Sequence, residues 1–251
     1  MRYFLEFSYK GTAYHGWQRQ PNAITVQQQM EDALSTLLGK ETAVLAAGRT
    51  DTGVHAKQMF AHVDLSLTAE AVKQLSHRLN KFLPQDIAIV NIHPVKADAH
   101  ARFDAISRSY AYHLVQFKHP FAHELAYTFT QPLDWDAMNA AAKLLLSHTN
   151  FKCFSRSKTD VKTYDCKVTE AYWTQSDSEW IFHISANRFL RNMVRAIVGT
   201  LLDVGTGKSS LADFQAILDS EDRTKGGSSA PAQGLFLTQV QYPNTIFETN
   251  G

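Results

Sequence analysis

Cysteine is almost absent from this chain, which has only Cys153 and Cys166 among its 251 residues. Neither belongs to a C-x-x-C or other metal-type spacing, so the sequence indicates neither a disulfide framework nor a cysteine-based zinc site. Two isolated thiols are typical of a protein that stays in a reducing cytosol.

Long hydrophobic runs are missing too. The first residues, Met-Arg-Tyr-Phe-Leu-Glu, lack the apolar core of a signal peptide. The most apolar later window, residues 193–204, contains Arg195 and Asp203. It is also shorter than the roughly 20 residues that a membrane span needs. We therefore expect a cytoplasmic protein with no membrane segment.

The chain has almost no excess charge of either sign. It contains 25 Lys and Arg residues against 24 Asp and Glu residues, for a formal net charge of +1. The total therefore does not indicate a polyanionic partner, and any nucleic-acid site has to be a local basic patch.

Metal and nucleotide motifs are lacking as well. Asp51, His55 and His62 match no spacing of a known metal site, and the 11 histidines are scattered singly. Residues 205–209, Gly-Thr-Gly-Lys-Ser, end like a phosphate-binding loop, but Leu202 stands where that motif requires glycine. The segment also follows a predicted helix rather than a strand. We predict a helix C-terminal loop there, and no metal or cofactor.

The pattern of apolar residues in the first half predicts a strand, a helix, two strands, a helix and a strand. The strands are expected at 2–9, 42–47, 57–65 and 86–95. Thr25 is expected to cap the first helix, which ends at Gly39, and Thr68 the second, which runs to Phe82 before Pro84. This order is that of the ferredoxin-like fold, which also hosts RNA recognition, although the fold alone does not fix a function.

The second half loosely repeats this order, with insertions. Strands are expected at 108–115, 167–174, 179–186 and 235–242, and helices at 134–146, 188–204 and 211–218. We predict an α+β protein of two ferredoxin-like (RRM-like) domains with antiparallel sheets, joined around a central catalytic cleft. The predicted domains are residues 1–98 and 99–251, because residues 96–106 have the composition of a connector.

One short stretch carries most of the chemical signal: residues 48–56, Gly-Arg-Thr-Asp-Thr-Gly-Val-His-Ala. A strand is predicted on each side, so Asp51 lies in a turn, where a rigid scaffold can present a side chain to a ligand. The alternative is ordinary turn chemistry, in which Asp51 bonds its own backbone and the glycines supply unusual dihedral angles. The turn alone does not decide between the two.

The loop at residues 10–23 contains Trp17, Gln18 and Arg19. Aromatic and amide side chains in an irregular segment suit stacking on bases and hydrogen bonding to them. The alternative is that Trp17 plugs the side of a core, and the sequence leaves both interpretations open.

Three arginines accompany the helix predicted at 188–204. At about 100° per residue, Arg188, Arg191 and Arg195 fall within a roughly 60° arc beside its apolar stripe. Guanidinium groups bind carboxylates and phosphates well. We interpret one arginine as the partner of a carboxylate and the others as phosphate contacts.

Several blocks of sequence together resemble the TruA family of tRNA pseudouridine synthases. The first is the Asp51 stretch itself, and the N-terminal blocks are residues 9–12, 16–22 and 25–27. The later blocks are residues 100–105, His-Ala-Arg-Phe-Asp-Ala; Arg108, Tyr110 and Tyr112; and residues 189–190 with 193–201. The blocks follow the family's order over most of the chain. Asp98 and Ala99 stand where many members have phenylalanine, and Arg191 and Asn192 where histidines are common.

This resemblance implies isomerisation of uridine to pseudouridine in the anticodon stem-loop of tRNA, typically at positions 38 to 40, by a homodimer without a cofactor. It implies that Asp51 is the nucleophile, that Arg195 pairs with it, and that Tyr110 stacks on the base and helps to remove its C5 proton. Arg49 is expected to wedge into the stack that the extruded uridine vacates or to bind the neighbouring phosphate. The other predicted RNA contacts are Trp17, Gln18, Arg19, His55, Arg102, Arg108, Arg188 and Arg191.

Two alternatives belong to other classes or substrates. A catalytically silent RNA-binding module would need the basic and aromatic residues but not Asp51, and a pseudouridine synthase could act on another RNA. A metal-dependent hydrolase fails on ligand spacing. Turnover in EDTA without added nucleotide separates the isomerase from both the module and the hydrolase.

Overall fold

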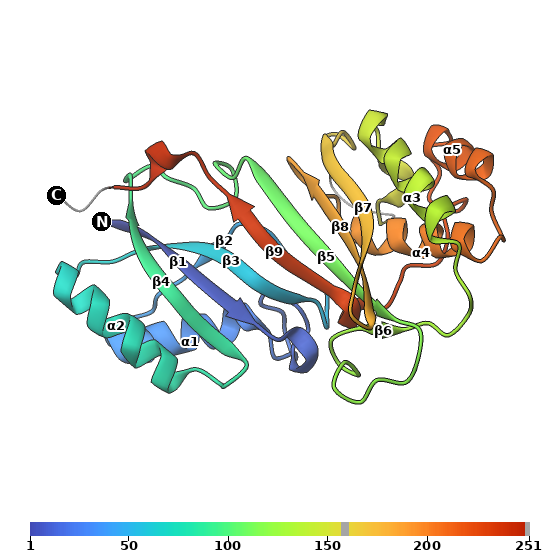
Figure 1. Cartoon of the computed structure of the whole chain (residues 1–251). Helices are drawn as coiled ribbons and strands as arrows, with labels where there is room; N and C mark the ends of the chain where they lie inside the picture. Colours follow the sequence, from blue (N-terminus) through green and yellow to red (C-terminus); the bar gives the residue numbers. More distant parts are fainter. Residues whose placement is uncertain (157–160, 249–251) are drawn as a thin grey trace. The chain divides into compact units, whose positions relative to one another are not determined.

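The computed structural model describes residues 1–156 and 161–248 (Figure 1). The chain divides into two compact units. Unit 1 comprises Met1–Ile106 and Leu237–Gly251, and unit 2 comprises Ser107–Phe236. The division falls after Ile106, because Ala101 and Ile106 bond to the C-terminal segment of unit 1. The predicted domains, residues 1–98 and 99–251, stay a prediction.

Unit 1 has the expected ferredoxin-like strand arrangement. Its strands are β1 (Arg2–Tyr9), β2 (Leu45–Ala46), β3 (His55–Asp64) and β4 (Ile87–Val95). They lie in the order β4-β1-β3, with β2 on the far edge of β3, and every pair is antiparallel. The C-terminal part of β9 (Leu235–Gln241) also lies beside β3. The strand expected at 42–47 is reduced to two residues.

Two helices cover one face of this sheet (Figure 1). They are α1 (Val26–Leu38) and α2 (Ala69–Phe82). The Thr25 hydroxyl accepts a hydrogen bond from the backbone of Gln28, and that of Thr68 from Ala71, so both predicted N-caps are confirmed. Gly39 ends α1 with φ of 68°, the left-handed conformation that favours glycine.

The opposite face of the sheet is packed with aromatic rings. The Phe4 ring lies 5.0 Å from that of Tyr242 and 6.3 Å from that of Phe247, so the C-terminal segment closes this side of unit 1. Phe60 contacts Tyr242 edge to face at 5.2 Å. The fold therefore keeps both ends of the chain in one unit.

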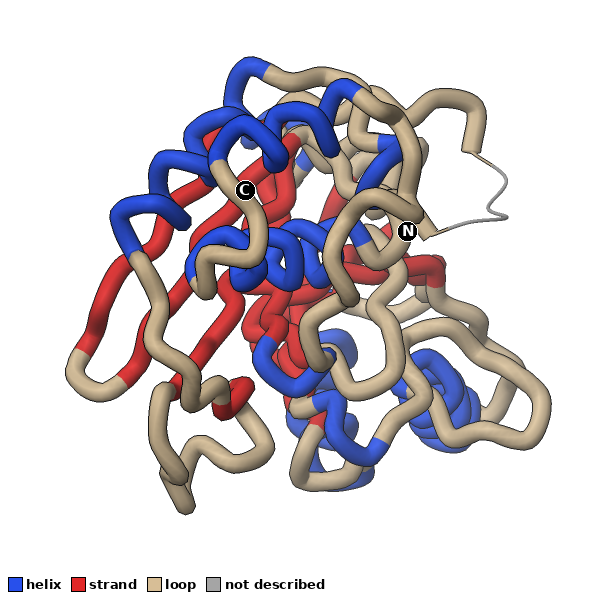
Figure 2. The backbone as a smooth tube through the Cα atoms, turned by 90° about the vertical axis from the view of Figure 1, so that its right-hand side faces the viewer, coloured by secondary structure: helices blue, strands red, loops and turns tan. Residues whose placement is uncertain are grey.

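Unit 2 also combines antiparallel strands with helices. Its elements are β5 (Ser107–Val115), β6 (Tyr127–Thr128), α3 (Trp135–Leu144), β7 (Val168–Ser176), β8 (Glu179–Ala186), α4 (Met193–Gly205) and α5 (Leu211–Asp219). The strands run β5-β8-β7, all antiparallel, with the short β6 parallel to β5. Figures 1 and 2 show α3, α4 and α5 packed together on one side of these strands. The α+β class with mostly antiparallel strands is confirmed.

The helix expected at 188–204 begins later than predicted. Helix α4 starts at Met193. Asn192, the residue before it, has φ of 66°, a left-handed conformation that cannot form part of a right-handed helix. Arg188 and Arg191 therefore precede the helix, and the shared 60° arc predicted for them with Arg195 is wrong.

Candidate active site

Asp51 lies in a tight turn that leads from β2 into β3. The Val54 amide donates to the Asp51 carbonyl at 3.1 Å, and Gly53 has φ of 80°. The backbone of Asp51 therefore closes the turn, and its half-buried side chain is not needed for that bond. Ordinary turn chemistry therefore involves the backbone of Asp51, and a catalytic role of its carboxylate stays a prediction.

The loop at residues 10–24 supports this turn through backbone hydrogen bonds. The Trp17 amide donates to the Thr50 carbonyl at 3.3 Å, and the Gly53 amide donates to the Tyr14 carbonyl at 3.3 Å. Gly16 makes the closest approach. It has φ of 86°, and a Cβ atom added to it would lie 2.4 Å from the Thr50 carbonyl oxygen. Only glycine fits under the Asp51 turn at this position.

Side chains fasten the same turn. The hydroxyls of Tyr9 and Thr50 share a hydrogen bond of 2.8 Å. His55 is buried, and its Nδ1 accepts the Gly11 amide proton at 2.9 Å. A ring nitrogen that accepts carries no proton, so the proton of the neutral ring is on Nε2. The structure places the predicted residue His55 as a brace for this loop.

Buried Tyr14 anchors the other side of the supporting loop. Its hydroxyl donates to Asp86, at the start of β4. Burial, followed by this hydrogen bond to a carboxylate, raises the pKa of Tyr14, so the hydroxyl keeps its proton and the bond at any ordinary pH.

The three predicted RNA contacts of this loop differ in their surroundings. Trp17 is 3% exposed, and its ring lies 5.3 Å from that of Phe7, which favours the core-plug interpretation. Gln18 is exposed. Arg19 donates from Nη1 to the buried Glu31 carboxylate at 3.0 Å, and its Nη2 lies 3.7 Å from Asp32.

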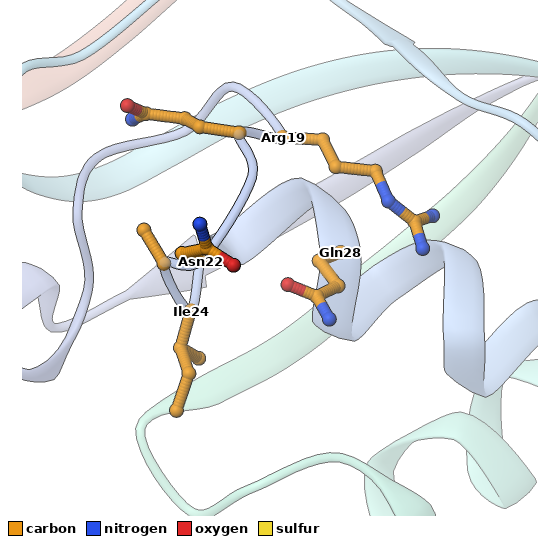
Figure 3. A pocket seen from close by; sticks show the side chains of 6 residues that line it. Arg19, Asn22, Ile24 and Gln28 are labelled. Carbon is orange, nitrogen blue, oxygen red and sulfur yellow. The ribbon is translucent and has the colours of Figure 1, made fainter.

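Side chains of this loop and of α1 line a hollow of about 350 Å³ (Figure 3). Amide side chains from the loop and from α1 dominate its wall, which consists of Arg19, Gln20, Asn22, Ala23, Ile24 and Gln28. Two carboxylates neutralise Arg19, so the hollow presents hydrogen-bonding groups rather than a net positive charge.

The remaining predicted residues of unit 1 lie at its surface. Arg49 and Arg102 are both exposed. The Arg102 guanidinium carbon is 5.5 Å from the centre of the exposed Phe103 ring. The backbone amides of Arg102 and Phe103 both donate to Nδ1 of His100. These two bonds shape the start of the connector at residues 96–106.

In unit 2, Tyr110 and Arg108 share one face of β5, because alternate residues of a strand point the same way. The Tyr110 ring meets the Phe189 ring edge to face at 5.1 Å. The Arg108 side chain donates to the Asn187 carbonyl at 3.0 Å. The segment before α4 therefore packs against the strand that carries Tyr110.

Arg195 lies in the first turn of α4, and its side chain is oriented by a neighbouring loop. Its Nε donates to the Ala230 carbonyl at 2.7 Å, and the Ala230 amide donates to the Arg195 carbonyl at 2.9 Å. A Cβ atom added to Gly199 would lie 1.7 Å from the Ser228 carbonyl oxygen, so glycine lets this loop lie on the helix. Sequence reasoning missed that Ala230 orients Arg195. The contact is made by a backbone carbonyl, which every residue has, so the residue type at position 230 does not indicate it.

The predicted residues thus divide between the two units. Trp17, Gln18, Arg19, Arg49, Asp51, His55 and Arg102 belong to unit 1, and Arg108, Tyr110, Arg188, Arg191 and Arg195 to unit 2. Sequence reasoning also missed the support that Gly16 and Tyr9 give to the Asp51 turn. Nothing in the sequence around Gly16 indicates that this residue has a positive φ.

The structure bears on four features that the sequence analysis discussed. Thr206 caps the C-terminus of α4, so the loop after it is the predicted helix end. No group of three or more metal-binding side chains occurs in residues 1–156 and 161–248. None of the helices in that part of the chain has both the length and the apolar character that a bilayer crossing requires. Cys153 and Cys166 are buried, which raises their thiol pKa values to about 12 and about 11.

His62 on β3 gives unit 1 a stability that depends on pH. Burial, followed by the charges of His100 and Arg2, lowers the pKa of His62 to about 4, although Asp64 opposes this. Its Nδ1 accepts the Ala101 amide proton at 3.1 Å. The unfolded chain binds this proton near pH 6.5 and the folded chain only near pH 4, so stability falls as the pH drops through that window.

We therefore expect the melting temperature to fall between pH 6.5 and 4, and to fall less steeply in His62→Gln. Thermal melts across this range measure the slope. His77→Gln, at an exposed position on α2, is the matched control and should melt like the wild type. Identical slopes for all three proteins would contradict the role of His62.

Comparison with known proteins shows the family of the chain. The family model described as tRNA pseudouridine synthase matches residues 7–104 and 141–243. The protein called tRNA pseudouridine synthase A in Porphyromonas gingivalis is 53% identical over 249 residues, covering 98% of this chain and 99% of that protein. The proteins of the same name in Bacteroides fragilis (98% of both chains) and Syntrophomonas wolfei (95% of this chain, 96% of that protein) are 51% and 38% identical. The chain belongs to the tRNA pseudouridine synthase family.

Proposed function

We propose that this protein isomerises uridine to pseudouridine at positions 38 to 40 of the tRNA anticodon stem-loop, with Asp51 as nucleophile. The observation that supports the proposal is the Asp51 turn, which backbone hydrogen bonds and the close approach of Gly16 hold in place while Asp51 itself is only half-buried. The tRNA substrate follows from the names of the relatives.

The reaction is balanced without a co-reactant. The bond between uracil N1 and ribose C1′ breaks, the base turns, and a bond between C5 and C1′ forms. The proton on C5 leaves and N1 gains one, so no electrons are exchanged with an outside partner. Asp51 would attack the sugar or the base and be released in the last step, which is covalent catalysis by a carboxylate.

The target uridine has to leave the base stack before Asp51 can reach it. Extruding a nucleotide costs on the order of a few kcal/mol. We assign Arg49, exposed two residues from Asp51, to the vacated stack or to the adjacent phosphate. Tyr110 would stack on the turned base and help to remove its C5 proton. Trp17 and His55, both buried, would support the turn, whereas Gln18, Arg19, Arg102, Arg108, Arg188 and Arg191 would contact RNA.

Tritium release from tRNA that carries 5-tritiated uridine tests the function, because the reaction frees the C5 hydrogen. The purified protein should release tritium in EDTA without nucleotide, and mapping should place pseudouridine at positions 38 to 40. Product only in another RNA would overturn the substrate, and RNA binding without product would favour the silent module. We also propose a cytoplasmic homodimer, which a monomer in light scattering at micromolar concentration would contradict.

We propose that the Arg195 guanidinium pairs with the Asp51 carboxylate and keeps that carboxylate ionised. Because the Ala230 carbonyl already fixes Nε, the terminal nitrogens have a defined direction. We expect Arg195→Ala to lower kcat by about 10²-fold with little change in KM, since it removes an interaction of the reacting group. Single-turnover kinetics at saturating tRNA provides the measurement. A raised KM with unchanged kcat would make Arg195 a phosphate contact only.

A further inference from the structure

Three separate segments of unit 2 meet at one surface. The Arg156 amide donates to the Arg191 carbonyl at 3.0 Å, which joins the loop before residue 156 to the segment that leads into α4. The Phe151 amide donates to the Tyr164 carbonyl at 3.0 Å, and the Cys166 amide to the Thr149 carbonyl at 3.0 Å. Residues 149–156 and 164–167 are thus held side by side.

Asn187 ties the third segment to the same place. Its amide donates to the Lys167 carbonyl at 3.1 Å, and its side-chain oxygen accepts the Lys167 amide proton at 2.7 Å. Its own carbonyl accepts from Arg108 on β5. Backbone bonds therefore fix the spacing of this surface.

The surface concentrates positive charge. The three segments, 149–156, 164–167 and 187–191, contain five basic residues and one acidic residue, Asp165. We call these five the basic strip: Lys152, Arg156, Lys167, Arg188 and Arg191. All but Arg188 are exposed. Asp222 lies close enough to Lys152 for their charges to interact, so a second negative charge stands beside the strip.

We infer that the basic strip binds the phosphate backbone of the RNA beside the predicted catalytic tyrosine. In a chain with a net charge of only +1, five cations gathered on fixed backbone form a local polyanion site. Phe189 lies between two arginines of the strip in sequence, and its ring contacts Tyr110. The inference rests on the proposed function and adds Lys152, Arg156 and Lys167 to the RNA contacts.

The test is the salt dependence of tRNA binding. Each phosphate contact releases counterions, so the slope of log affinity against log salt changes by about 0.7 to 0.9 per contact. In an Asp51→Asn background, which prevents turnover, we expect Lys152→Ala/Arg156→Ala/Lys167→Ala to reduce the slope by about 2 and the affinity at least about 10-fold. Filter binding at several salt concentrations supplies both numbers.

Two control proteins separate the strip from general charge and from folding. Lys208→Ala removes an exposed cation beyond the C-terminal end of α4, and it should leave the slope unchanged. The charge-preserving variant Lys152→Arg/Arg156→Lys/Lys167→Arg should restore the wild-type slope. A wild-type slope in the alanine variant, or an equal loss per cation in Lys208→Ala, would overturn the inference. Failure of the proposed function would show separately, as wild-type protein that makes no pseudouridine in tRNA.

Discussion

Asp51→Asn is expected to abolish pseudouridine formation, lowering the single-turnover rate by at least about 10⁴-fold. The amide has nearly the shape of the carboxylate but cannot act as the nucleophile. The fold should survive, because the turn is closed by the Asp51 carbonyl and supported through the backbone of Thr50 and Gly53. Tritium release measures the rate, and filter binding should find tRNA affinity within about threefold of the wild type.

The matched control is Asp98→Asn, which removes an exposed carboxylate from the same unit. It should isomerise tRNA at the wild-type rate, so that a loss of activity in Asp51→Asn cannot be assigned to a change in net charge. Tritium release by Asp51→Asn at the wild-type rate would remove Asp51 from the mechanism. A large loss of tRNA affinity would instead assign Asp51 to RNA binding.

The helices and strands that could be predicted from sequence are those whose ends have a local chemical signal. Thr25 and Thr68 each accept the predicted capping hydrogen bond, and Asp134 accepts one from the Ala137 amide at the start of the helix expected at 134–146. Helices α1, α2 and α3 therefore begin where the sequence places them. Strands β1 and β8 have the predicted bounds, because aromatic and aliphatic residues recur along them and turn residues end them.

The prediction failed where a single backbone angle decides the structure. Apolar periodicity continued from Leu190 into α4, but the left-handed conformation of Asn192 separates them. The loop before β9 shows the same limit. Its bonds to Arg195 and Thr200 depend on a close approach at Gly199, and long-range backbone contacts leave no pattern in the sequence. Asp51 itself could be singled out, because a motif of nine consecutive residues surrounds it.

Gly16→Ala is the second large effect that we expect. The substitution meets two penalties at once, since φ of 86° is unfavourable for alanine and its Cβ would lie 2.4 Å from the Thr50 carbonyl oxygen. The first costs roughly 1–2 kcal/mol of folding free energy. The overlap adds about 1–3 kcal/mol, because backbone has to move. The moving backbone is that of the Asp51 turn, so kcat should fall by about 10²-fold, as a 1 Å displacement of a reacting group can cost.

Gly39→Ala separates these two penalties. Gly39 has φ of 68°, also in the left-handed region, but no atom lies within 4 Å of the position of its added Cβ. It should therefore lose only about 1 kcal/mol of stability and keep its wild-type kcat. Thermal melts and single-turnover kinetics on both variants give the comparison. If Gly16→Ala lost no more activity than Gly39→Ala, the Gly16 segment would not hold the Asp51 turn, and the order of that turn would have to come from its own backbone bond and from the Tyr9–Thr50 hydrogen bond.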